Sequence, residues 1–408
     1  MKYYIQKNKI LKGEINLPSS KSISNRLLLI RALCDHDFKI NNLSDCDDTT
    51  LLSTALDNLK EFEINIENAG TPMRFLTAYL ASQTGEYTLT GTQRMQERPI
   101  KELVEALKEL GANIEYLKKG GYPPIKIKGQ KLKGNEISIR ADVSSQFISA
   151  IMLIAPTLET GLTINLIGKI LSRDYIVMTQ RLMIEFGINV SWDKNIIKIE
   201  KGKYKAKDYT IEADWSSAAC WFEMAAFAEE TDIKLIGLHK NSIQGDSVLP
   251  KIFHNIGVST EYLSDGIKLS KNNKHITSFK FDFISNPDLV QTLAVTLVGL
   301  SIPFEFSGLD NLNIKETNRV NALKIELLKL GSSIDDNEKN NISWDGRKIR
   351  INQKEIFYST YADHRMAMAF APLAIIHDNV IINQPMVVTK SYPNFWKDFV
   401  SVGFNISN

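Results

Sequence analysis

The chain has 408 residues, which is too long for one ordinary hydrophobic core and predicts two domains of about 200 residues each. Apolar residues make up 43% and charged residues 24% of it, as in soluble globular proteins. The formal net charge of +2 is close to neutral, which argues against binding nucleic acid or a membrane surface through bulk charge.

Cysteine usage and apolar runs exclude further classes. Cys34, Cys46 and Cys220 are too few and too far apart for a disulfide framework or a zinc site, so no metal is expected. The longest apolar runs, 147–156 and 289–303, are shorter than the roughly 20 residues that span a bilayer. The first residues lack a signal-peptide pattern, so we expect a cytoplasmic protein.

The first predicted element is a short strand at residues 14–17, followed by a strongly apolar helix that begins within residues 20–26. Lys21 lies at the mouth of this helix and Arg26 about one turn further in. Alone, the segment is slightly better explained as a serine N-cap with solvated charges, and it lacks the glycine frame of a phosphate-binding P-loop.

A second helix begins within residues 68–74, where Gly70 permits close backbone approach and Pro72 suits the first helical turn. Short strands and helices then alternate, with strands at 136–140, 162–166 and 197–200 and helices at 100–110 and 216–228. This alternation predicts an α/β fold.

Five polar segments each place Lys, Arg or Ser where an apolar helix is predicted to begin. They are residues 20–26, 68–74, 143–146, 315–319 and 363–365. A helix N-terminus offers unpaired N–H groups and about half a positive charge, so it attracts anions. Several such starts with added cations predict a site for a ligand with more than one phosphate or carboxylate.

A helix, a glycine and a strand recur in that order, which predicts six βα units, three in each of two domains. The glycines are Gly111, Gly187, Gly257, Gly331 and Gly403, spaced by 70 to 76 residues; a sixth copy without glycine lies at 56–64. Because this order is common in α/β proteins, the repeat alone leaves other α/β folds open.

Motifs from about residue 13 to 397 resemble, in order and spacing, those of the 5-enolpyruvylshikimate-3-phosphate synthase family (3-phosphoshikimate 1-carboxyvinyltransferase). Besides the five segments, they include Arg-Met-Gln-Glu-Arg-Pro-Ile at 94–100, Asp-Trp-Ser-Ser-Ala at 214–218 and Asp-His-Arg-Met-Ala-Met at 363–368. Each motif is weak alone, whereas the ordered set is highly specific.

The resemblance implies a two-domain α/β fold, each domain built of three βαβαββ units with the ligand cleft between them. One domain would comprise residues 1–17 and 214–408, the other 18–213, and the two crossovers would act as a hinge. A cytoplasmic monomer is implied, with no cofactor, no metal and no nucleic-acid or membrane partner.

The implied reaction transfers the enolpyruvyl group of phosphoenolpyruvate to the 5-hydroxyl of shikimate 3-phosphate and releases phosphate, in the shikimate pathway of aromatic amino-acid biosynthesis. Matching positions imply two binding sets. Phosphoenolpyruvate would be held by Lys21, Gly70, Arg98, Gln146, Arg319, Arg365 and Lys390. Shikimate 3-phosphate would be held by Lys21, Ser22, Arg26, Ser144, Ser145, Gln146, Ser172, Tyr175, Asp288, Asn311 and Lys315.

The resemblance also implies that Asp288, Glu316 and Lys21 transfer protons, with His364 as a possible further group. From the residues alone, the favoured interpretations are a helix N-cap for Asp288 and an i,i+3 partner of Arg319 for Glu316. Lys390 would otherwise be a solvated loop lysine.

Some positions depart from the family pattern. Asn318 stands where Asp is usual, and we expect this position to orient Arg319. The motif around Asn311 is altered, and Phe75 replaces a frequent Pro. Gly70 is retained at the position where a Cβ would crowd glyphosate, which implies sensitivity to that inhibitor, weakened by Phe75.

Three other functions fit the sequence less well. UDP-N-acetylglucosamine enolpyruvyl transferase shares the fold but relies on a loop cysteine, and none of the three cysteines lies in a suitable glycine-rich loop. A non-catalytic anion-binding relative is disfavoured because the matched positions hold functional residue types. A nucleic-acid-binding module would need a basic face interleaved with aromatics.

Overall fold

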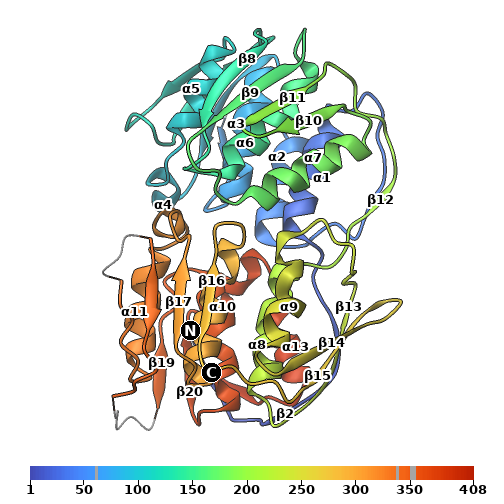
Figure 1. Ribbon diagram of the computed structural model, residues 1–408. Coiled ribbons are helices and arrows are strands. Elements are labelled where there is room, and N and C mark those ends of the chain that lie inside the picture. Colours follow the sequence, from blue (N-terminus) through green and yellow to red (C-terminus); the bar gives the residue numbers. More distant parts are fainter. Residues whose placement is uncertain (60–62, 337–339, 350–354) are drawn as a thin grey trace. The chain divides into compact units, whose positions relative to one another are not determined.

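The computed structural model describes residues 1–59, 63–336, 340–349 and 355–408 (Figure 1). The chain divides into two units. Unit 1 comprises Met1–Ser19 and Glu212–Asn408, and unit 2 comprises Ser20–Ile211. Among the described residues no helix is long and apolar enough to cross a membrane.

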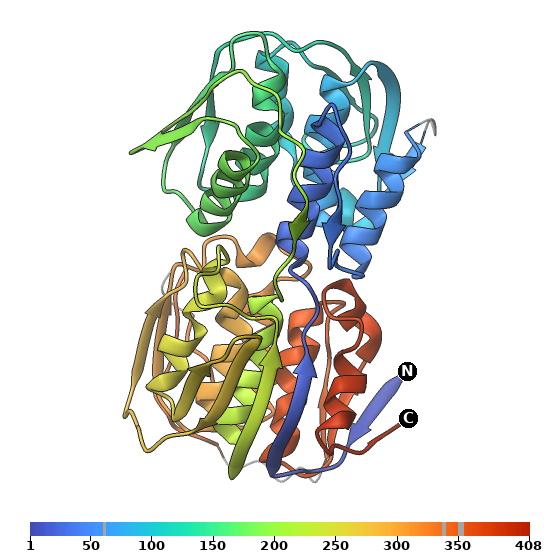
Figure 2. The ribbon, with the colours of Figure 1, turned by 90° about the vertical axis from the view of Figure 1, so that its right-hand side faces the viewer.

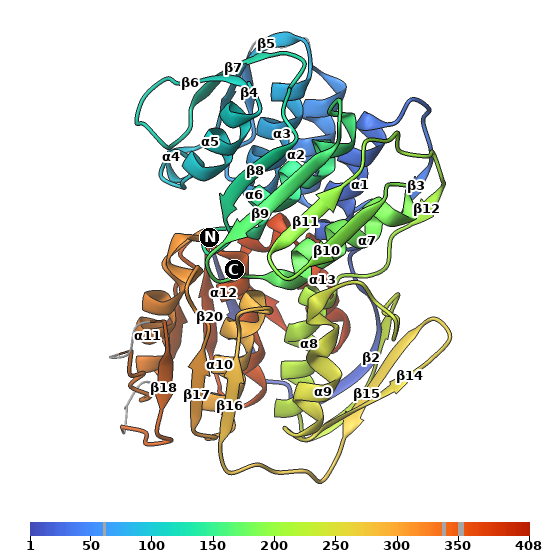
Figure 3. The same ribbon diagram turned by 45° about the horizontal axis from the view of Figure 1, so that its top comes forward.

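Unit 2 contains three sheets in its described part. Its strands are β3 Ile40–Asn41, β4 Glu63–Asn65, β5 Gly85–Thr90, β6 Asn113–Tyr116, β7 Ile125–Gly129, β8 Glu136–Arg140, β9 Leu162–Ile167, β10 Val190–Asp193, β11 Ile196–Ile199 and β12 Tyr209–Thr210. The sheet orders are β4-β5-β7-β6, β10-β11-β9-β8 and β12-β3. Figure 3 shows β8, β9, β11 and β10 side by side in that order.

The helices of unit 2 pack among themselves and against these sheets. They are α1 Lys21–Leu33, α2 Asp47–Asp57, α3 Gly70–Ser82, α4 Gln93–Gln96, α5 Lys101–Glu109, α6 Ser145–Ile154, the short 3-10 helix η1 Ala155–Thr157 and α7 Arg173–Glu185. Helices α1, α3 and α6 pack against one another, and α7 packs against α1 and α6. The starts of α1, α3 and α6 carry three of the predicted polar segments.

Unit 1 also contains three sheets in its described part. Its strands are β1 Lys2–Ile5, β2 Ile10–Asn16, β13 Glu230–Ile236, β14 Val258–Tyr262, β15 Gly266–Lys271, β16 Phe279–Asp282, β17 Phe304–Ser307, β18 Ile342–Trp344, β19 Ile356–Tyr358, β20 Val380–Asn383 and β21 Ile406–Ser407. The orders are β14-β15-β13-β2, β16-β17-β18 and β19-β20-β1-β21. Figure 2 shows β2, in dark blue, lying along the yellow-green strand β13, with which it pairs in parallel.

The helices of unit 1 build its core. They are α8 Trp215–Phe227, η2 Gly245–Val248, α9 Leu249–His254, η3 Pro287–Leu289, α10 Val290–Gly299, η4 Leu312–Ile314, α11 Arg319–Leu328, α12 His364–Phe370, η5 Ala371–Ile375, η6 Pro385–Lys390 and α13 Phe395–Ser401. Helices α8, α10 and α12 pack against one another and are buried nearly all round, as their continuous apolar sequences predict.

The burial patterns of two strands show how a sheet of this protein covers the helices beneath it. Residues of β7 and β8 alternate between buried and exposed, so each strand has one face on the core and one facing solvent. The five repeat glycines all have positive φ, between 80° and 99°, as expected for a glycine that ends a helix.

Three sheets in each unit agree with the predicted threefold repetition, with one difference. The third sheet of unit 2 has only the two short strands β3 and β12 in the described part, not four. The polar stretch 201–208 before β12 lacks the apolar alternation that a longer strand needs. The sixth sequence copy, 56–64, includes residues 60–62, which lie outside the described residues.

Candidate functional site

All five polar segments lie at helix starts, as predicted. Four of the helices have a side-chain N-cap, from Ser20 on α1, Ser144 on α6, Asn318 on α11 and Asp363 on α12. In α3 the first residue is Gly70, and Ala69 stands at the cap position. The candidate residues therefore form one cluster in each unit.

The cluster in unit 1 is a continuous network of charges. Arg319 Nη1 donates to Asp288 Oδ1 at 3.0 Å, and Arg365 Nη2 lies 2.9 Å from Asp288 Oδ2. Arg319 Nη2 donates to Glu316 Oε2 at 3.2 Å, and Lys390 Nζ lies 3.0 Å from Glu316 Oε1. The structure thus brings together two predicted proton-transfer carboxylates and three predicted phosphoenolpyruvate-binding cations.

Arg319 is the centre of this network. Besides Asp288 and Glu316, it bonds Asp363, with 2.8 Å between Nε and Oδ2 and 3.5 Å between Nη2 and Oδ1. Its side chain is 2% exposed. Burial opposes the charged form, but the three carboxylates outweigh it and raise the pKa of Arg319. The guanidinium is therefore a fixed cation at any working pH.

Asp363 and His364 begin α12. Asp363 is fully buried and accepts a hydrogen bond from the backbone N–H of Arg365 at 2.9 Å, so it caps the helix while bonding Arg319. His364 is also buried, with Nδ1 3.7 Å from Asp363 Oδ1. The sequence pattern predicted a helix start at this segment but no role for Asp363.

Asn318 has a different role from the one expected. Its side-chain oxygen accepts from Asn321 N at 3.0 Å, which caps α11. Three carboxylates from elsewhere hold the Arg319 side chain instead. An amide suits a helix cap as well as a carboxylate does, so Asn in place of Asp leaves the Arg319 contacts intact.

Asp246, on η2, is a carboxylate that sequence reasoning missed. It is 4% exposed; Ser216 Oγ donates to its Oδ2 at 2.5 Å and Asn286 Nδ2 to its Oδ1 at 3.2 Å. Burial and the charge of Asp288 raise the pKa of Asp246 to about 6, against the opposite effect of Arg365. Asp246 therefore belongs electrostatically to the same cluster.

Asn311 and Lys315 flank η4 in unit 1. Asn311 is 6% exposed and precedes the first residue of η4, and Lys315 follows its last residue in extended conformation. Both lie in the turn that leads to Glu316 and α11.

In unit 2, Lys21 is the first residue of α1. Its Nζ lies 3.5 Å from Asp48 Oδ2, and the two side chains are 16% and 5% exposed. Asp48, on α2, is a second carboxylate without an assigned role in the sequence analysis, although the pair Asp47-Asp48 at a helix start was a visible signal. Lys21 therefore has a buried counter-ion.

Gly70 and Arg98 are adjacent in unit 2. A Cβ at Gly70 would lie 2.6 Å from Arg98 Nη2 and 2.7 Å from Nη1, so only glycine leaves room for this guanidinium. Arg98 is 6% exposed, and its Nε and Nη1 have no hydrogen-bond partner among the described residues. A buried cation with unpaired N–H groups is costly unless an anion completes it.

Arg74 fixes the surroundings of Arg98 and was also missed. Its Nη1 donates to Gly70 O at 3.1 Å and its Nη2 to Pro99 O at 3.0 Å. The Arg74 side chain thereby ties the start of α3 to the loop between α4 and α5, which carries Arg98.

Arg26 is buried and bonds only oxygen atoms of neutral groups in the contacts described. Its Nη1 donates to Ser22 O at 2.8 Å, its Nε to Thr179 Oγ1 at 2.7 Å and its Nη2 to Tyr175 O at 3.0 Å. Burial lowers the pKa of Arg26 to about 10, which still leaves it charged at neutral pH. Ser172, with φ of 53°, precedes α7, and its carbonyl accepts from Tyr175 N at 3.1 Å.

The start of α6 carries the remaining predicted residues. Ser144 Oγ accepts from Gln146 N at 3.3 Å, and Ser145 is 6% exposed. Gln146 Nε2 donates to Thr71 Oγ1 at 3.0 Å, which joins the starts of α6 and α3. The predicted residues of unit 2 thus lie at the starts of α1, α3, α6 and α7 or, for Arg98, against Gly70.

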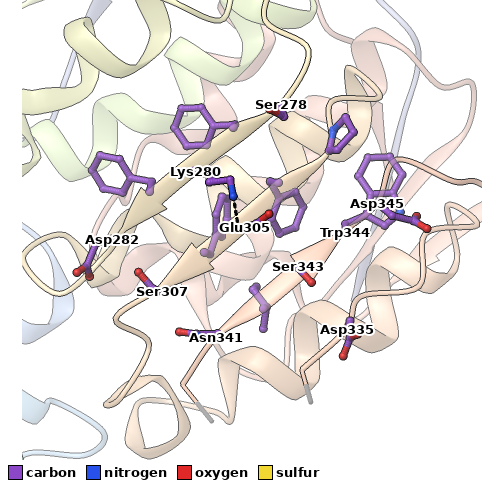
Figure 4. Close-up of a pocket in the computed structure, with 16 residues that line it drawn as sticks. Ser278, Lys280, Asp282, Glu305, Ser307, Asp335, Asn341, Ser343, Trp344 and Asp345 are labelled. Atoms are coloured by element: carbon purple, nitrogen blue, oxygen red, sulfur yellow. Dashed lines mark ion pairs between the residues drawn. The ribbon is translucent and has the colours of Figure 1, made fainter. Parts of the chain in front are cut away.

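A further surface depression lies outside these two clusters. It has a volume of about 730 Å³ and lies on the sheet of β16, β17 and β18, where Lys280 and Glu305 point toward each other (Figure 4). The described residues that line it include none of the predicted site residues. Its polar side chains are those of an ordinary exposed sheet face.

The fold and the two clusters define a class of α/β protein that presents cations and carboxylates at helix starts, as an enzyme acting on anionic small molecules requires. A sequence model of the family described as EPSP synthase (3-phosphoshikimate 1-carboxyvinyltransferase) matches residues 5–65 and 60–399. This chain belongs to that family.

Individual relatives are consistent with this family membership. A 3-phosphoshikimate 1-carboxyvinyltransferase of Bacteroides fragilis is 48% identical over 408 residues, covering 100% of this chain and 99% of the relative. One from Sulfurovum sp. is 34% identical over 422 residues, covering 96% and 97%. A solved EPSP synthase from Acinetobacter baumannii has a TM-score of 0.79 at 20% identity, with 100% of both chains covered, and so shares the fold.

Proposed function

We propose that this chain catalyses the transfer of the enolpyruvyl group of phosphoenolpyruvate to the 5-hydroxyl of shikimate 3-phosphate, and that both clusters serve this reaction. The observation that carries the proposal is the network in which Asp288 and Glu316 alternate with Lys390, Arg319 and Arg365. It supplies carboxylates for proton transfer beside cations for phosphate and carboxylate groups.

For phosphoenolpyruvate, we propose Lys21, Gly70, Arg98, Gln146, Arg319, Arg365 and Lys390 as the binding set. Arg98 supports this assignment because it is a buried cation with two unpaired nitrogens beside a helix-initial glycine. An oxyanion of the substrate would accept from the guanidinium and from backbone N–H groups at the start of α3.

For shikimate 3-phosphate, the proposed set is Lys21, Ser22, Arg26, Ser144, Ser145, Gln146, Ser172, Tyr175, Asp288, Asn311 and Lys315. Hydroxyl, amide and cationic groups suit a ligand with one phosphate, one carboxylate and free hydroxyls. Ser144, Ser145 and Gln146 gather at one helix start, which supports a phosphate-binding role there.

The proposed chemistry balances as an addition followed by an elimination. The 5-hydroxyl oxygen forms a bond to C2 of phosphoenolpyruvate while a carboxylate, assigned here to Asp288, takes the hydroxyl proton. The methylene carbon C3 gains a proton from Lys21 or Glu316. The same group, now deprotonated, then takes a proton back from C3 as the C2–O bond to phosphate breaks, giving the enolpyruvyl ether and inorganic phosphate.

The oligomeric state, the cellular location and a hinge motion of the protein are also proposals. The family resemblance is the ground for proposing a cytoplasmic monomer without a membrane partner, and the near-neutral net charge supports the proposal that nucleic acid is not a partner. The crossovers near residues 17 and 213 are proposed as a hinge. Small-angle scattering should then show a smaller radius with shikimate 3-phosphate than without it.

The test of the reaction is phosphate release from phosphoenolpyruvate, with and without shikimate 3-phosphate. We expect release only with both substrates, and a loss of at least about 100-fold in kcat for Asp288→Asn, because a positioned acid/base group contributes that much or more. Asp232→Asn, on an exposed ion pair with Lys268, is the matched control. No release by the wild type would overturn the proposal.

A further inference from the structure

We infer that Tyr361 and Glu326 are positioning residues: together they hold a strained turn that sets Asp363 and Arg365 in the charge network of unit 1. The inference rests on the proposed function, because it concerns the same site. Neither residue belongs to the sets proposed above to contact substrate.

The turn 360–363 has an unfavourable backbone. Tyr361 and Ala362 have φ of 53° and 55°, and they are the only two consecutive non-glycine residues with positive φ in the described parts of the chain. Asp363 N donates to Thr360 O at 2.9 Å and closes the turn. Positive φ at both central positions is normally left to Asn and Gly, so other contacts must hold this conformation.

Glu326 supplies those contacts at the beginning of the turn. It is fully buried; Tyr361 Oη donates to its Oε1 at 2.7 Å, and Ser359 N donates to its Oε2 at 3.1 Å. Lys329 neutralises it, with Nζ 2.6 Å from Oε2, and also donates to Phe357 O at 2.7 Å. One carboxylate therefore fixes the backbone and the side chain that flank Thr360.

Helix α11 holds both ends of the turn. Glu326 follows Arg319 by seven residues, which places both on the same helix face, roughly 10 Å apart along the axis. Glu326 bonds Ser359 and Tyr361, whereas Arg319 bonds Asp363. The strained turn is thus fixed between two side chains of one helix.

The conformation of this turn determines where Asp363 and Arg365 lie in the site. Asp363 immediately follows the turn, caps α12 through Arg365 N and bonds Arg319. Relaxation of Ala362 toward negative φ would turn the Asp363–Arg365 backbone away from Asp288 and Arg319. Glu326 and Tyr361 therefore act through Asp363 and Arg365, and their loss should weaken phosphoenolpyruvate binding more than protein folding.

The test uses Tyr361→Phe, which removes only the hydroxyl, in the full chain. We expect KM for phosphoenolpyruvate to rise about tenfold, since small misplacements of binding groups have effects of this order or larger, with KM for shikimate 3-phosphate unchanged. Glu326→Gln is the second variant and should shift the same constant. Tyr87→Phe, which removes a hydroxyl bonded to Thr84 O in unit 2, is the control.

A rescue separates positioning from a merely structural role. Adding Ala362→Gly to Tyr361→Phe relieves the positive-φ strain, so KM for phosphoenolpyruvate should return toward the wild-type value. An unchanged KM in folded Tyr361→Phe and Glu326→Gln, or a failure of Ala362→Gly to restore it, would overturn the inference. Wild-type phosphate release, measured in parallel, shows separately whether the proposed reaction stands.

Discussion

Gly70 and Arg98 lie so close that the guanidinium of Arg98 occupies the space where any other residue at position 70 would carry its Cβ. The contact explains why α3 begins with glycine, although only proline has a lower helix propensity. It also links a backbone position to a buried cation, so a change at either residue should act on the other.

Gly70→Ala should displace Arg98 and raise KM for phosphoenolpyruvate at least about tenfold, because the Cβ would lie well inside contact distance of a group proposed to bind that substrate. KM for shikimate 3-phosphate should change little. Steady-state kinetics with each substrate varied in turn checks this. Gly120→Ala is the matched control, since a Cβ there meets nothing within 4 Å. Equal changes in both KM values would count against a specific Gly70–Arg98 effect.

Arg98→Met should separate stability from binding. The variant removes a buried cation with two unpaired nitrogens while keeping an apolar stem, so the ligand-free protein should be as stable as the wild type or more stable by about 1–3 kcal/mol. Phosphoenolpyruvate should lose the thermal stabilisation that it gives the wild type in the presence of shikimate 3-phosphate.

Thermal unfolding with and without both ligands checks this prediction. Arg94→Met, on the exposed ion pair with Glu97, is the control and should leave ligand stabilisation intact. A large loss of ligand-free stability in Arg98→Met would mean that Arg98 has a structural partner and is not held ready for an anion.

The helix starts and the local pair Glu316–Arg319 were predictable from sequence, whereas the pairing of charges distant in the sequence was not. Ser20, Ser144 and Asp363 precede apolar runs, and local capping chemistry is enough to place such starts. By contrast, Arg319 meets Asp363 across 44 residues, and Asp246 meets Asn286 across 40. Those partners are brought together by the packing of elements distant in the sequence of unit 1, for which a single sequence carries no direct signal.

Position 318 also shows that side-chain contacts are harder to predict from sequence than helix starts. The family pattern, which usually has Asp here, suggested that this position orients Arg319. In the structure the side chain of Asn318 points into the first turn of α11, and the carboxylates that hold Arg319 come from η3, the preceding loop and the turn before α12. Resemblance to a family supplied the candidate residues; the contacts among them required coordinates.

Asp246→Asn should remove an ionisation from the pH profile. Burial and Asp288 raise the pKa of Asp246 to about 6, so the wild-type carboxylate becomes protonated as the pH falls through that value. Arg365 then loses a neighbouring negative charge, so the site attracts the anionic substrate more strongly and kcat/KM for phosphoenolpyruvate should gain a rising step below about pH 6. The amide of the variant does not titrate, so its profile should lack this step and start from a higher plateau at neutral pH.

The measurement is kcat/KM from about pH 5 to 9 at saturating shikimate 3-phosphate, because this ratio reports ionisations of the enzyme before phosphoenolpyruvate binds. Asp265→Asn, on an exposed ion pair with Lys234, should keep the wild-type profile. An Asp246→Asn profile with the same inflection would assign the step to another group.

Glu223 should make the stability of the protein fall as the pH rises. It is fully buried on α8, and burial raises its pKa well above the ordinary value of 4.5, with the Thr296 hydroxyl acting in the opposite direction. Between the unfolded and folded pKa values the folded state binds more protons than the unfolded state. Stability is therefore greatest below the unfolded pKa and is lost above it, by at most about 1.4 kcal/mol per pH unit.

Glu223→Gln keeps the shape and cannot ionise, so its stability relative to the wild type should increase from about pH 5 to pH 8 in urea unfolding. Glu229→Gln, whose side chain is 64% exposed, is the control. Activity at neutral pH should be preserved in both variants, because Glu223 lies in the packed core of unit 1 and outside the charge network. A difference between Glu223→Gln and wild type that does not vary with pH would mean that the buried carboxyl keeps the same proton affinity in the folded and unfolded states.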